Sequence, residues 1–244
     1  MWFIIILLLC LLFFKHRTEE PFTTDNVIFI TLTNNGYIDY TLNCYKSMNN
    51  LNMNLHSYVI GKEAYDKLKG RERTLLPSND TEFSEFRKGN WHNITKQKFK
   101  IIHDNLKHYK YVCFTDGDIV YKKNVIDYCF EHIGGNDILI QNDTLDDDDH
   151  SNLCSGFMFI RSNDKTKRLF NPTIATKDAK EGWGDQMYIN SIKEKLKYKM
   201  LPLNLFPNGQ YYYKYQPKSY LIHFNWIVGH KKKDKMKSYG YWFI

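Results

Sequence analysis

Two carboxylates separated by one residue follow an apolar segment near the middle of the chain. Asp116 and Asp118 flank Gly117, after the apolar run 111–115 and before a second apolar stretch, 119–121. Side chains at positions i and i+2 of an extended segment point to the same side. The two carboxylates can therefore share one hard divalent cation and leave its other positions open to phosphate oxygens. We interpret the segment as a metal site; a turn in which the aspartates make only local hydrogen bonds is the alternative.

The same spacing of carboxylates occurs in the acidic run 146–149. That run lies in a polar stretch, whereas Asp116 follows a predicted strand, and open α/β sheets bind ligands at the carboxyl ends of their strands. We therefore expect residues 146–149 to form a solvated surface loop, with a loop that covers the binding site as the alternative.

Two segments near the C-terminus carry groups that suit a site for metal and phosphate. His223 lies at the end of a predicted strand, and an imidazole can complete an oxygen-rich Mn²⁺ site; a purely structural histidine is the alternative. Gly229 precedes the lysine-rich run 231–237, from which Lys231 or Lys232 can bind phosphate oxygens. A solvated lysine-rich surface is the alternative for this run.

The segment 182–186 combines residue types that recognise sugars. Asp185 and Gln186 can exchange several hydrogen bonds with hydroxyl groups, and the face of Trp183 can cover the apolar side of a sugar ring. A helix cap or an acidic residue in the first turn of a helix also explains Asp185. Gly156 would allow a sugar ring to approach the backbone, or would mark a bulge or tight packing in a strand.

Alternating strand and helix patterns predict an α/β fold. Strand patterns span residues 27–32, 56–60, 111–115, 137–141, 153–160, 198–203 and 220–224. Helix patterns span residues 37–48, 62–69, 95–108, 124–132 and 183–195. The β-α-β-α order at the start favours parallel strands joined by right-handed crossovers. Since no repeat and no second boundary is visible, residues 26–244 are predicted to form one domain.

The N-terminus predicts a membrane anchor over residues 1–17. Residues 1–14 are apolar and are followed by Lys15 and Arg17. A helix of that apolar length covers roughly 20 Å, less than the ~30 Å hydrocarbon core, and snorkelling of the basic side chains would close the gap. A cleaved signal peptide is the alternative, but no positive n-region and no small-residue cleavage site is visible. Residues 18–25 then form a linker, and the flanking charge of this single-pass protein places its main domain in the cytoplasm.

Composition and missing motifs exclude several classes of protein. Hydrophobic residues make up 43% of the 244-residue chain, which argues against global disorder. The net charge is +7, but no recognition-helix or RNP-type pattern accompanies the basic residues, so no nucleic-acid partner is predicted. The motifs of P-loop ATPases, dinucleotide-dependent oxidoreductases, zincins and serine hydrolases are absent from the sequence.

These segments together resemble the nucleotide-diphospho-sugar transferase family, in the group that contains plant-type α-xylosyl- and galactosyltransferases. The resemblance covers roughly residues 26–237 and rests on the order of the motifs along the chain. The matching segments are 33–37, 98–99, 114–118, 155–157, 183–186 and 223–225, followed by Gly229. Gly117 stands where many members of the family have alanine, a departure that leaves both carboxylates in place.

The resemblance implies a GT-A (Rossmann-like) fold with a mixed, mostly parallel central sheet flanked by helices. It also implies a glycosyltransferase that depends on Mn²⁺ or Mg²⁺. The donor would be a nucleotide sugar linked to UDP, and the acceptor a hydroxyl group of a glycan or glycoprotein. Transfer is expected to retain the anomeric configuration through front-face attack. Anchored relatives face the Golgi or ER lumen, which is the opposite of the orientation that the flanking charge favours.

The resemblance further implies a role for each site residue. Asp116, Asp118 and His223 would bind the metal, and Asp185 and Gln186 would face the reacting sugar as the catalytic residues. The residues that bind the donor would be Thr33, Asn35, Tyr37, Lys98, Asp116, Gly229 and Lys232.

Three other functions remain as alternatives. A sugar-nucleotide nucleotidyltransferase shares the α/β core and the metal, but it should carry an Arg-containing, Gly-rich loop after its first strand, and residues 33–36 contain no arginine. A metal-dependent nuclease would use paired carboxylates to cleave DNA. A non-catalytic carbohydrate-binding protein would bind a glycan without turning over a UDP-sugar.

Overall fold

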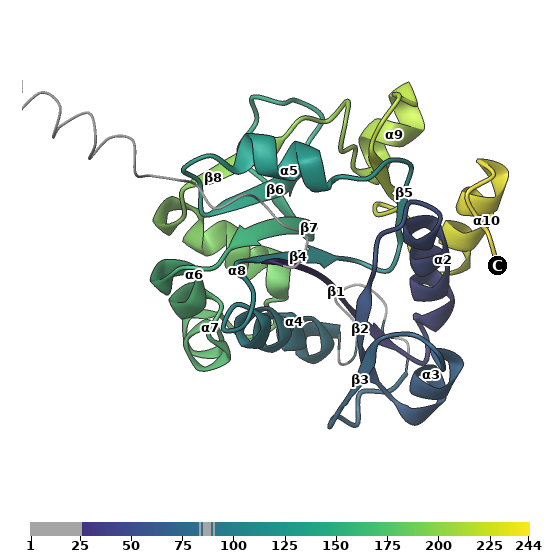
Figure 1. Cartoon of the computed structure of the whole chain (residues 1–244), viewed down its shortest axis with the longest axis horizontal. Helices are drawn as coiled ribbons and strands as arrows, with labels where there is room; N and C mark the ends of the chain where they lie inside the picture. The colour runs from purple at the N-terminus through teal and green to yellow at the C-terminus, as the bar shows by residue number, and fades with distance from the viewer. Residues whose placement is uncertain (1–25, 83, 85–88, 90) are drawn as a thin grey trace, which may run out of the picture.

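A seven-stranded sheet forms the centre of the molecule, with helices on both of its faces (Figure 1). The computed structural model describes residues 26–82, 84, 89 and 91–244. In sheet order the strands are β3 (Arg73–Leu76), β2 (His56–Ile60), β1 (Val27–Asn34), β4 (Tyr111–Thr115), β7 (Leu153–Arg161), β6 (Ile138–Asn142) and β8 (Tyr198–Leu201). Within this sheet β7 runs antiparallel to both of its neighbours, and the other four pairings are parallel. The predicted α/β fold with a mixed, mostly parallel sheet is therefore confirmed.

The remaining elements are a two-stranded ribbon and a set of helices. The ribbon pairs β5 (Ile119–Tyr121) with β9 (Leu221–His223) in antiparallel fashion. The α-helices are α2 (Ile38–Asn49), α3 (Lys62–Lys67), α4 (Trp91–Asn105), α5 (Ile126–Ile133), α6 (Asp164–Leu169), α7 (Pro172–Asp178), α8 (Asp185–Ile192), α9 (Gly209–Tyr215) and α10 (His230–Ser238). A 3-10 helix, η2 (Lys193–Lys195), follows α8.

The central sheet is buried on both faces, which explains why its strands read as continuous apolar runs. Successive side chains of a strand enter opposite cores. Ile30 and Val112 belong to the core under α4, α7 and α8, whereas Phe29 and Cys113 belong to the core under α2 and α5 (Figure 1). The result is a three-layer arrangement of helices, sheet and helices.

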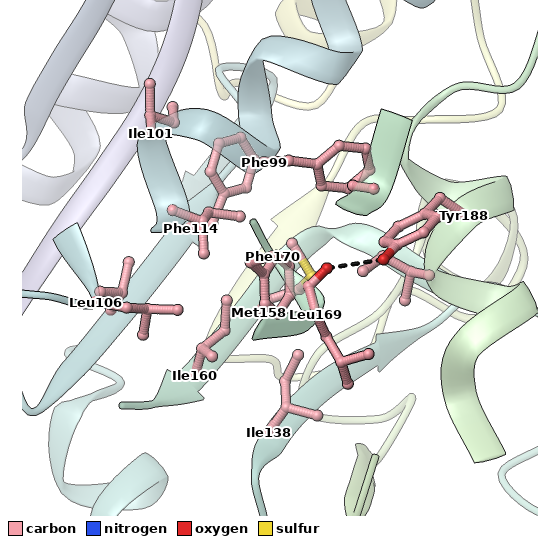
Figure 2. Close-up of a cluster of buried hydrophobic side chains, with 14 of the residues drawn as sticks. Phe99, Ile101, Leu106, Phe114, Ile138, Met158, Ile160, Leu169, Phe170 and Tyr188 are labelled. Atoms are coloured by element: carbon pink, nitrogen blue, oxygen red, sulfur yellow. Dashed lines mark hydrogen bonds between the residues drawn. The ribbon is translucent and has the colours of Figure 1, made fainter. Parts of the chain in front are cut away.

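An aromatic contact joins α4 to α8 (Figure 2). The rings of Phe99 and Tyr188 lie edge to face with their centroids 4.8 Å apart. Tyr188 Oη donates a hydrogen bond of 2.8 Å to the backbone oxygen of Leu169. Both rings are buried. This contact sets the relative positions of Lys98, which neighbours Phe99 on α4, and Asp185, which begins α8.

The C-terminal helix α10 packs beside α2 (Figure 1). Lys233 Nζ of α10 lies 3.3 Å from Asp39 Oδ2 of α2. Beyond α10, the buried side chain of Asn43 holds the chain at two points. Its Nδ2 donates a hydrogen bond of 2.9 Å to the backbone oxygen of Tyr241, and its Oδ1 accepts one of 2.6 Å from the backbone nitrogen of Phe243. The end of the chain is thus tied to the first helix after β1.

Most of the predicted elements are confirmed, and the differences have local causes. β1 continues through Thr33 and Asn34, where the sequence predicts a turn, because both residues pair with β2. Helix α4 begins at Trp91, ahead of its predicted start at Thr95. The sequence prediction lacks β3, β5, α6, α7, α9 and α10. The first five are short, and α10 is rich in lysine and carries only a weak apolar stripe.

The prediction of a single-pass membrane protein is corrected. Across residues 26–82, 84, 89 and 91–244, no helix combines the length and the apolar character that crossing a bilayer requires. The longest helix of this part, α4, has 15 residues and is amphipathic, because only one of its faces packs on the sheet. The predicted anchor, residues 1–17, and the linker, residues 18–25, lie outside the described residues.

Replacing Phe99 by alanine should lower the free energy of unfolding by about 3–5 kcal/mol, because it leaves a cavity between α4 and α8. Tyr188→Phe should lower it by about 1 kcal/mol, because it removes one hydrogen bond. Urea denaturation monitored by circular dichroism measures both values. Equal losses for the two variants would contradict the packing described for this contact.

Candidate functional site

A cavity of about 760 Å³ opens at one edge of the sheet. The carboxyl ends of β1, β4 and β6 meet at this edge because the three strands run in the same direction. Strand β7 runs the other way and contributes its beginning. Polar side chains from the ends of these four strands line the cavity: Thr33, Asp116, Asp143 and Ser155. This is the edge at which open α/β sheets bind ligands.

Asp116, Asp118 and His223 form a compact set of metal-binding groups in the cavity. Ile119 pairs with His223 across the β5–β9 ribbon, and Phe224 N donates a hydrogen bond of 3.0 Å to the backbone oxygen of Asp118. This register places the imidazole beside the carboxylates. His223 Nε2 lies 3.3 Å from Asp118 Oδ1 and 3.8 Å from Asp116 Oδ2, and one atom from each residue lies within 4.8 Å of the others. Two carboxylates and one imidazole fit a divalent cation such as Mn²⁺.

A buried glutamine orients the histidine. Gln141 Nε2 donates to the backbone oxygens of Phe206 and Pro207, at 3.0 and 2.9 Å. Its Oε1 is therefore the atom that faces His223 Nδ1, 2.9 Å away. Since an amide oxygen only accepts hydrogen bonds, this contact assigns the ring proton to Nδ1. Nε2 is left with a lone pair that faces the carboxylates, as a metal ligand requires.

Gly156 makes room for the imidazole. Its backbone oxygen accepts a hydrogen bond of 2.7 Å from Asp116 N. A Cβ atom at this position would collide with His223 Cε1 and would lie 2.9 Å from Asp116 Oδ2. The pairing between β6 and β7 also shifts here, because Met158 lies opposite Ile140 while Gln141 lies opposite a residue four positions earlier in β7. Tight packing and a strand irregularity, the alternatives to sugar contact, thus both apply to this glycine.

A buried lysine and a tyrosine surround Asp118. Lys232 Nζ of α10 forms an ion pair with Asp118 Oδ2 and donates a hydrogen bond of 2.7 Å to Tyr37 Oη. Tyr37 Oη in turn donates one of 3.2 Å to the same carboxylate oxygen. Burial would raise the pKa of Asp118, but the charge of Lys232 outweighs it and holds that pKa far below its ordinary value. Burial and the nearby carboxylate raise the pKa of Tyr37, which stays a neutral phenol.

Lys98 of α4 joins two further carboxylates of the cavity, Asp116 and Asp185. Its Nζ donates to Asp116 Oδ1 at 3.1 Å and to the backbone oxygen of Ser155 at 3.2 Å, and it forms an ion pair with Asp185 Oδ2. Ser155 Oγ donates a hydrogen bond of 2.6 Å to the same Asp185 oxygen. Burial would lower the pKa of Lys98, but Asp116 and Asp185 raise it above its ordinary value. Lys98 is therefore charged, and Asp185 Oδ2 has two donors.

Asp143, directly after β6, connects three segments of the chain that line the cavity. The residue is 8% exposed. Its Oδ2 accepts hydrogen bonds from Gln186 Nε2 at 2.9 Å and from Asn152 Nδ2 at 3.3 Å. Its Oδ1 accepts from Asn225 Nδ2 and Trp226 Nε1, both at 2.9 Å. One carboxylate thus holds four donors that come from three separate segments.

The structure gathers most of the predicted site residues around this cavity. Those that line it are Thr33, Tyr37, Lys98, Asp116, Asp118, Asp185, Gln186, His223, Gly229 and Lys232. Asn35 lies elsewhere, since its Oδ1 accepts a hydrogen bond of 2.9 Å from Ala64 N in α3. Its neighbour Asn34 lines the cavity instead. Of the two lysines considered for phosphate binding, Lys232 is buried in the site and Lys231 is exposed.

Two further sequence interpretations have clear outcomes. The acidic run 146–149 is exposed, as expected of a solvated loop. Trp183 is not among the residues that line the cavity, whereas Trp91 and Trp226 are. The aromatic face available to a bound sugar therefore comes from other tryptophans than the sequence suggests.

Sequence reasoning misses three residues of this site: Gln141, Asp143 and Trp226. The first two lie at the end of β6, and the rule that selects Asp116 after β4 would have selected them too. Trp226 has a positive φ of 62°, which no local sequence signal indicates.

Comparison with known proteins identifies the family. Residues 61–238 match the family of nucleotide-diphospho-sugar transferases. The chain belongs to this family. A curated relative is the UDP-galactose:fucoside alpha-3-galactosyltransferase of Dictyostelium discoideum, which is 25% identical over 287 aligned positions. The alignment covers 93% of this chain and 44% of the relative, so the chain spans less than half the length of that protein.

Solved structures of glycosyltransferases share the fold. The glycosyltransferase GlyE of Streptococcus pneumoniae TIGR4 superimposes with a TM-score of 0.59 at 15% identity, over 91% of this chain and 61% of that chain. Mouse xyloside xylosyltransferase 1 gives a TM-score of 0.51 at 12% identity, over 83% of this chain and 100% of that chain. The fold is thus like that of GT-A glycosyltransferases. The family match favours glycosyl transfer over the three alternatives.

Replacing Gly156 by alanine should displace His223 and weaken Mn²⁺ binding by at least about tenfold, because the added methyl group occupies the space of the imidazole. Electron paramagnetic resonance titration of Mn²⁺ measures the affinity. Gly135→Ala is the matched control, since its methyl group meets the flexible end of Lys197. Unchanged affinity in Gly156→Ala would show that the histidine does not bind the metal.

Replacing Gln141 by leucine should lower Mn²⁺ affinity by about 10–100-fold, because His223 loses the acceptor that fixes its tautomer. The same titration provides the measurement. In a His223→Ala background the substitution should cause no further loss, since Gln141 acts through that ring. A full additional loss in the double variant would assign Gln141 a different role.

Proposed function

We propose that this protein transfers a sugar from a UDP-linked donor to a hydroxyl group of a glycan or glycoprotein, in a reaction that depends on a divalent cation. The proposal is carried by one observation: Asp116, Asp118 and His223 converge in a cavity that also holds Lys98 and Lys232. The first three groups suit a divalent cation, and lysines suit phosphate oxygens. A nucleoside diphosphate bound with a cation needs both kinds of group.

Mn²⁺ or Mg²⁺ held by Asp116, Asp118 and His223 would supply positive charge to stabilise the diphosphate that leaves. Lys232 comes from α10, a helix that begins just after Gly229. This arrangement supports a diphosphate position between the metal ligands and the start of α10. Thr33 and Tyr37 line the part of the cavity that we assign to the nucleoside.

The sugar reacts at its C1 atom. As the bond from C1 to the diphosphate oxygen breaks, positive charge spreads over the ring and the acceptor hydroxyl group attacks C1. We assign Asp185 and Gln186 to the reacting sugar because both line the cavity beside the metal ligands.

Retention by front-face attack is the stereochemical course we propose. Asp185 Oδ2 already pairs with Lys98 and accepts a hydrogen bond from Ser155 Oγ, which weakens it as a nucleophile. A leaving phosphate oxygen would instead take the proton of the acceptor hydroxyl group. A glycosyl adduct on Asp185, detected by mass spectrometry, would contradict this course.

UDP-galactose is the donor to test first. The Dictyostelium relative is named for UDP-galactose and a fucoside, and the similarity extends over 93% of this chain. This supports a galactosyl donor, with a fucoside among the candidate acceptors.

With Mn²⁺ present, the protein should release UDP from UDP-galactose or another UDP-sugar, as measured by a coupled UDP assay. Asp118→Asn should reduce the rate by at least about 100-fold, because it removes one charged metal ligand. Asp148→Asn, which alters an exposed carboxylate outside the cavity, is the control and should keep the full rate. A folded, Mn²⁺-loaded protein that consumes no nucleotide sugar would contradict the proposed function.

A further inference from the structure

Trp226 has an unusual backbone conformation for a large side chain. Its φ angle is 62°, in the left-handed region that bulky residues rarely occupy. Its side chain lines the cavity, yet the residue is 56% exposed. A strained backbone and an exposed aromatic ring both cost free energy, and such features occur where function requires them. The combination therefore calls for a role in binding.

Buried polar contacts hold the polar edge of this ring. Trp226 Nε1 donates to Asp143 Oδ1 at 2.9 Å, and Asp143 is 8% exposed. The preceding residue is fixed as well, because Asn225 Oδ1 accepts a hydrogen bond of 2.6 Å from Gly209 N and its backbone oxygen accepts one from Tyr213 Oη. The indole nitrogen thus has its partner within the protein, and the ring is fixed in place.

Within the part of the chain that the structure describes, the faces of the ring have no comparable partner. Among the described residues, no aromatic ring stacks on Trp226 and no lysine or arginine lies over it. Val228, two residues later, also lines the cavity and is 58% exposed. An indole face beside an aliphatic side chain matches the C–H face of a pyranose ring, and the polar lining of the cavity, such as Asn152 and Asn190, matches its hydroxyl groups.

Asp143 also sets the position of this surface relative to the reacting sugar. Its Oδ2 accepts a hydrogen bond of 2.9 Å from Gln186 Nε2, and we assign Gln186 to the donor sugar. One carboxylate therefore contacts both Gln186 and Trp226. A ring stacked on Trp226 would lie next to the donor sugar, where an acceptor must be.

We propose that Trp226 is the platform on which a pyranose ring of the acceptor glycan stacks, and that Asp143 is the residue that positions this platform. The inference rests on the proposed function and deepens it, because it assigns the acceptor part of the cavity. It predicts that Trp226 determines acceptor affinity and has little influence on the affinity for UDP.

Fluorescence provides a test that does not depend on turnover. Methyl glycosides of fucose, galactose, glucose and xylose are titrated into the Mn²⁺–UDP complex, with tryptophan emission as the signal. At least one glycoside should change the emission of the wild-type protein, and Trp226→Phe should abolish the change, whereas Trp183→Phe should preserve it. If none of the four glycosides gives a signal that depends on Trp226, the proposal is wrong.

Variants separate the platform from a structural role. Trp226→Ala should raise the acceptor KM by at least about tenfold and keep the Kd for UDP within about twofold, because it removes the stacking face and one of the four hydrogen bonds to Asp143 but leaves the three candidate metal ligands in place. Trp226→Phe, which keeps an aromatic face, should raise the acceptor KM by about threefold or less. Trp226→Gly should bind the acceptor as weakly as Trp226→Ala while raising the Tm, because glycine accepts the positive φ.

The outcomes distinguish failure of this inference from failure of the proposed function. A wild-type enzyme that consumes UDP-sugar, together with a Trp226→Ala variant of unchanged acceptor KM, would overturn the platform alone. Equal losses of UDP and acceptor affinity in Trp226→Ala would also overturn it, because they indicate a collapsed cavity. A wild-type protein that shows the Trp226-dependent emission change but consumes no nucleotide sugar would overturn the proposed function and leave the sugar platform supported.

Discussion

The mutual repulsion of closely spaced carboxylates is the constraint on which the rest of this structure depends. Asp116 and Asp118 lie two residues apart at the edge of a sheet, and Asp185 approaches from α8. Carboxylates so close together in a low-dielectric site need positive partners. Lys98 and Lys232 provide them, each on a helix of its own, and His223 comes from a third element. The positions of α4 and α10 can thus be understood as the arrangement that brings compensating charge to one point, beside the neutral imidazole that β9 supplies.

The same charges would let one cavity hold both the cation and the diphosphate of the proposed reaction. Lys232 keeps Asp118 ionised far below neutral pH, so the carboxylate would bind a cation without losing a proton first. A bound diphosphate would form ion pairs with the lysines, while the cation would bind the carboxylates. Cation and anion therefore stabilise each other's binding, which is an electrostatic form of cooperativity.

The fold could be predicted from the sequence more completely than the site, because the strands depend on local apolar patterns whereas the site depends on contacts between distant segments. The strands β1, β4 and β7 follow from apolar runs, and the candidate metal-binding role of Asp116 and Asp118 follows from what surrounds them in the sequence. The approach of His223 depends on the register of the β5–β9 ribbon, which joins segments a hundred residues apart and leaves no local pattern. The sequence predicts that Asn35 binds the donor, whereas Asn34 is the residue that lines the cavity. The reason is again a long-range pairing, because the length of β1 is set by its pairing with β2. The left-handed backbone of Trp226 is stabilised by Asp143, far away in sequence, so no reading of the segment itself could reveal it.

The tie between α2 and the end of the chain has a consequence for the order of folding. The contact between Lys232 and Asp118 spans 114 positions, and the one between Lys232 and Tyr37 spans 195. Contacts of such long range form late, because closing a long loop costs conformational entropy before the contacts that compensate for it are made. The central sheet can form while β9 and α10 are still undocked, and a chain in that state has two carboxylates but neither the imidazole nor the second lysine. Tight binding of a cation is then a property of the finished molecule, and it reports that the last part of the chain has reached its place.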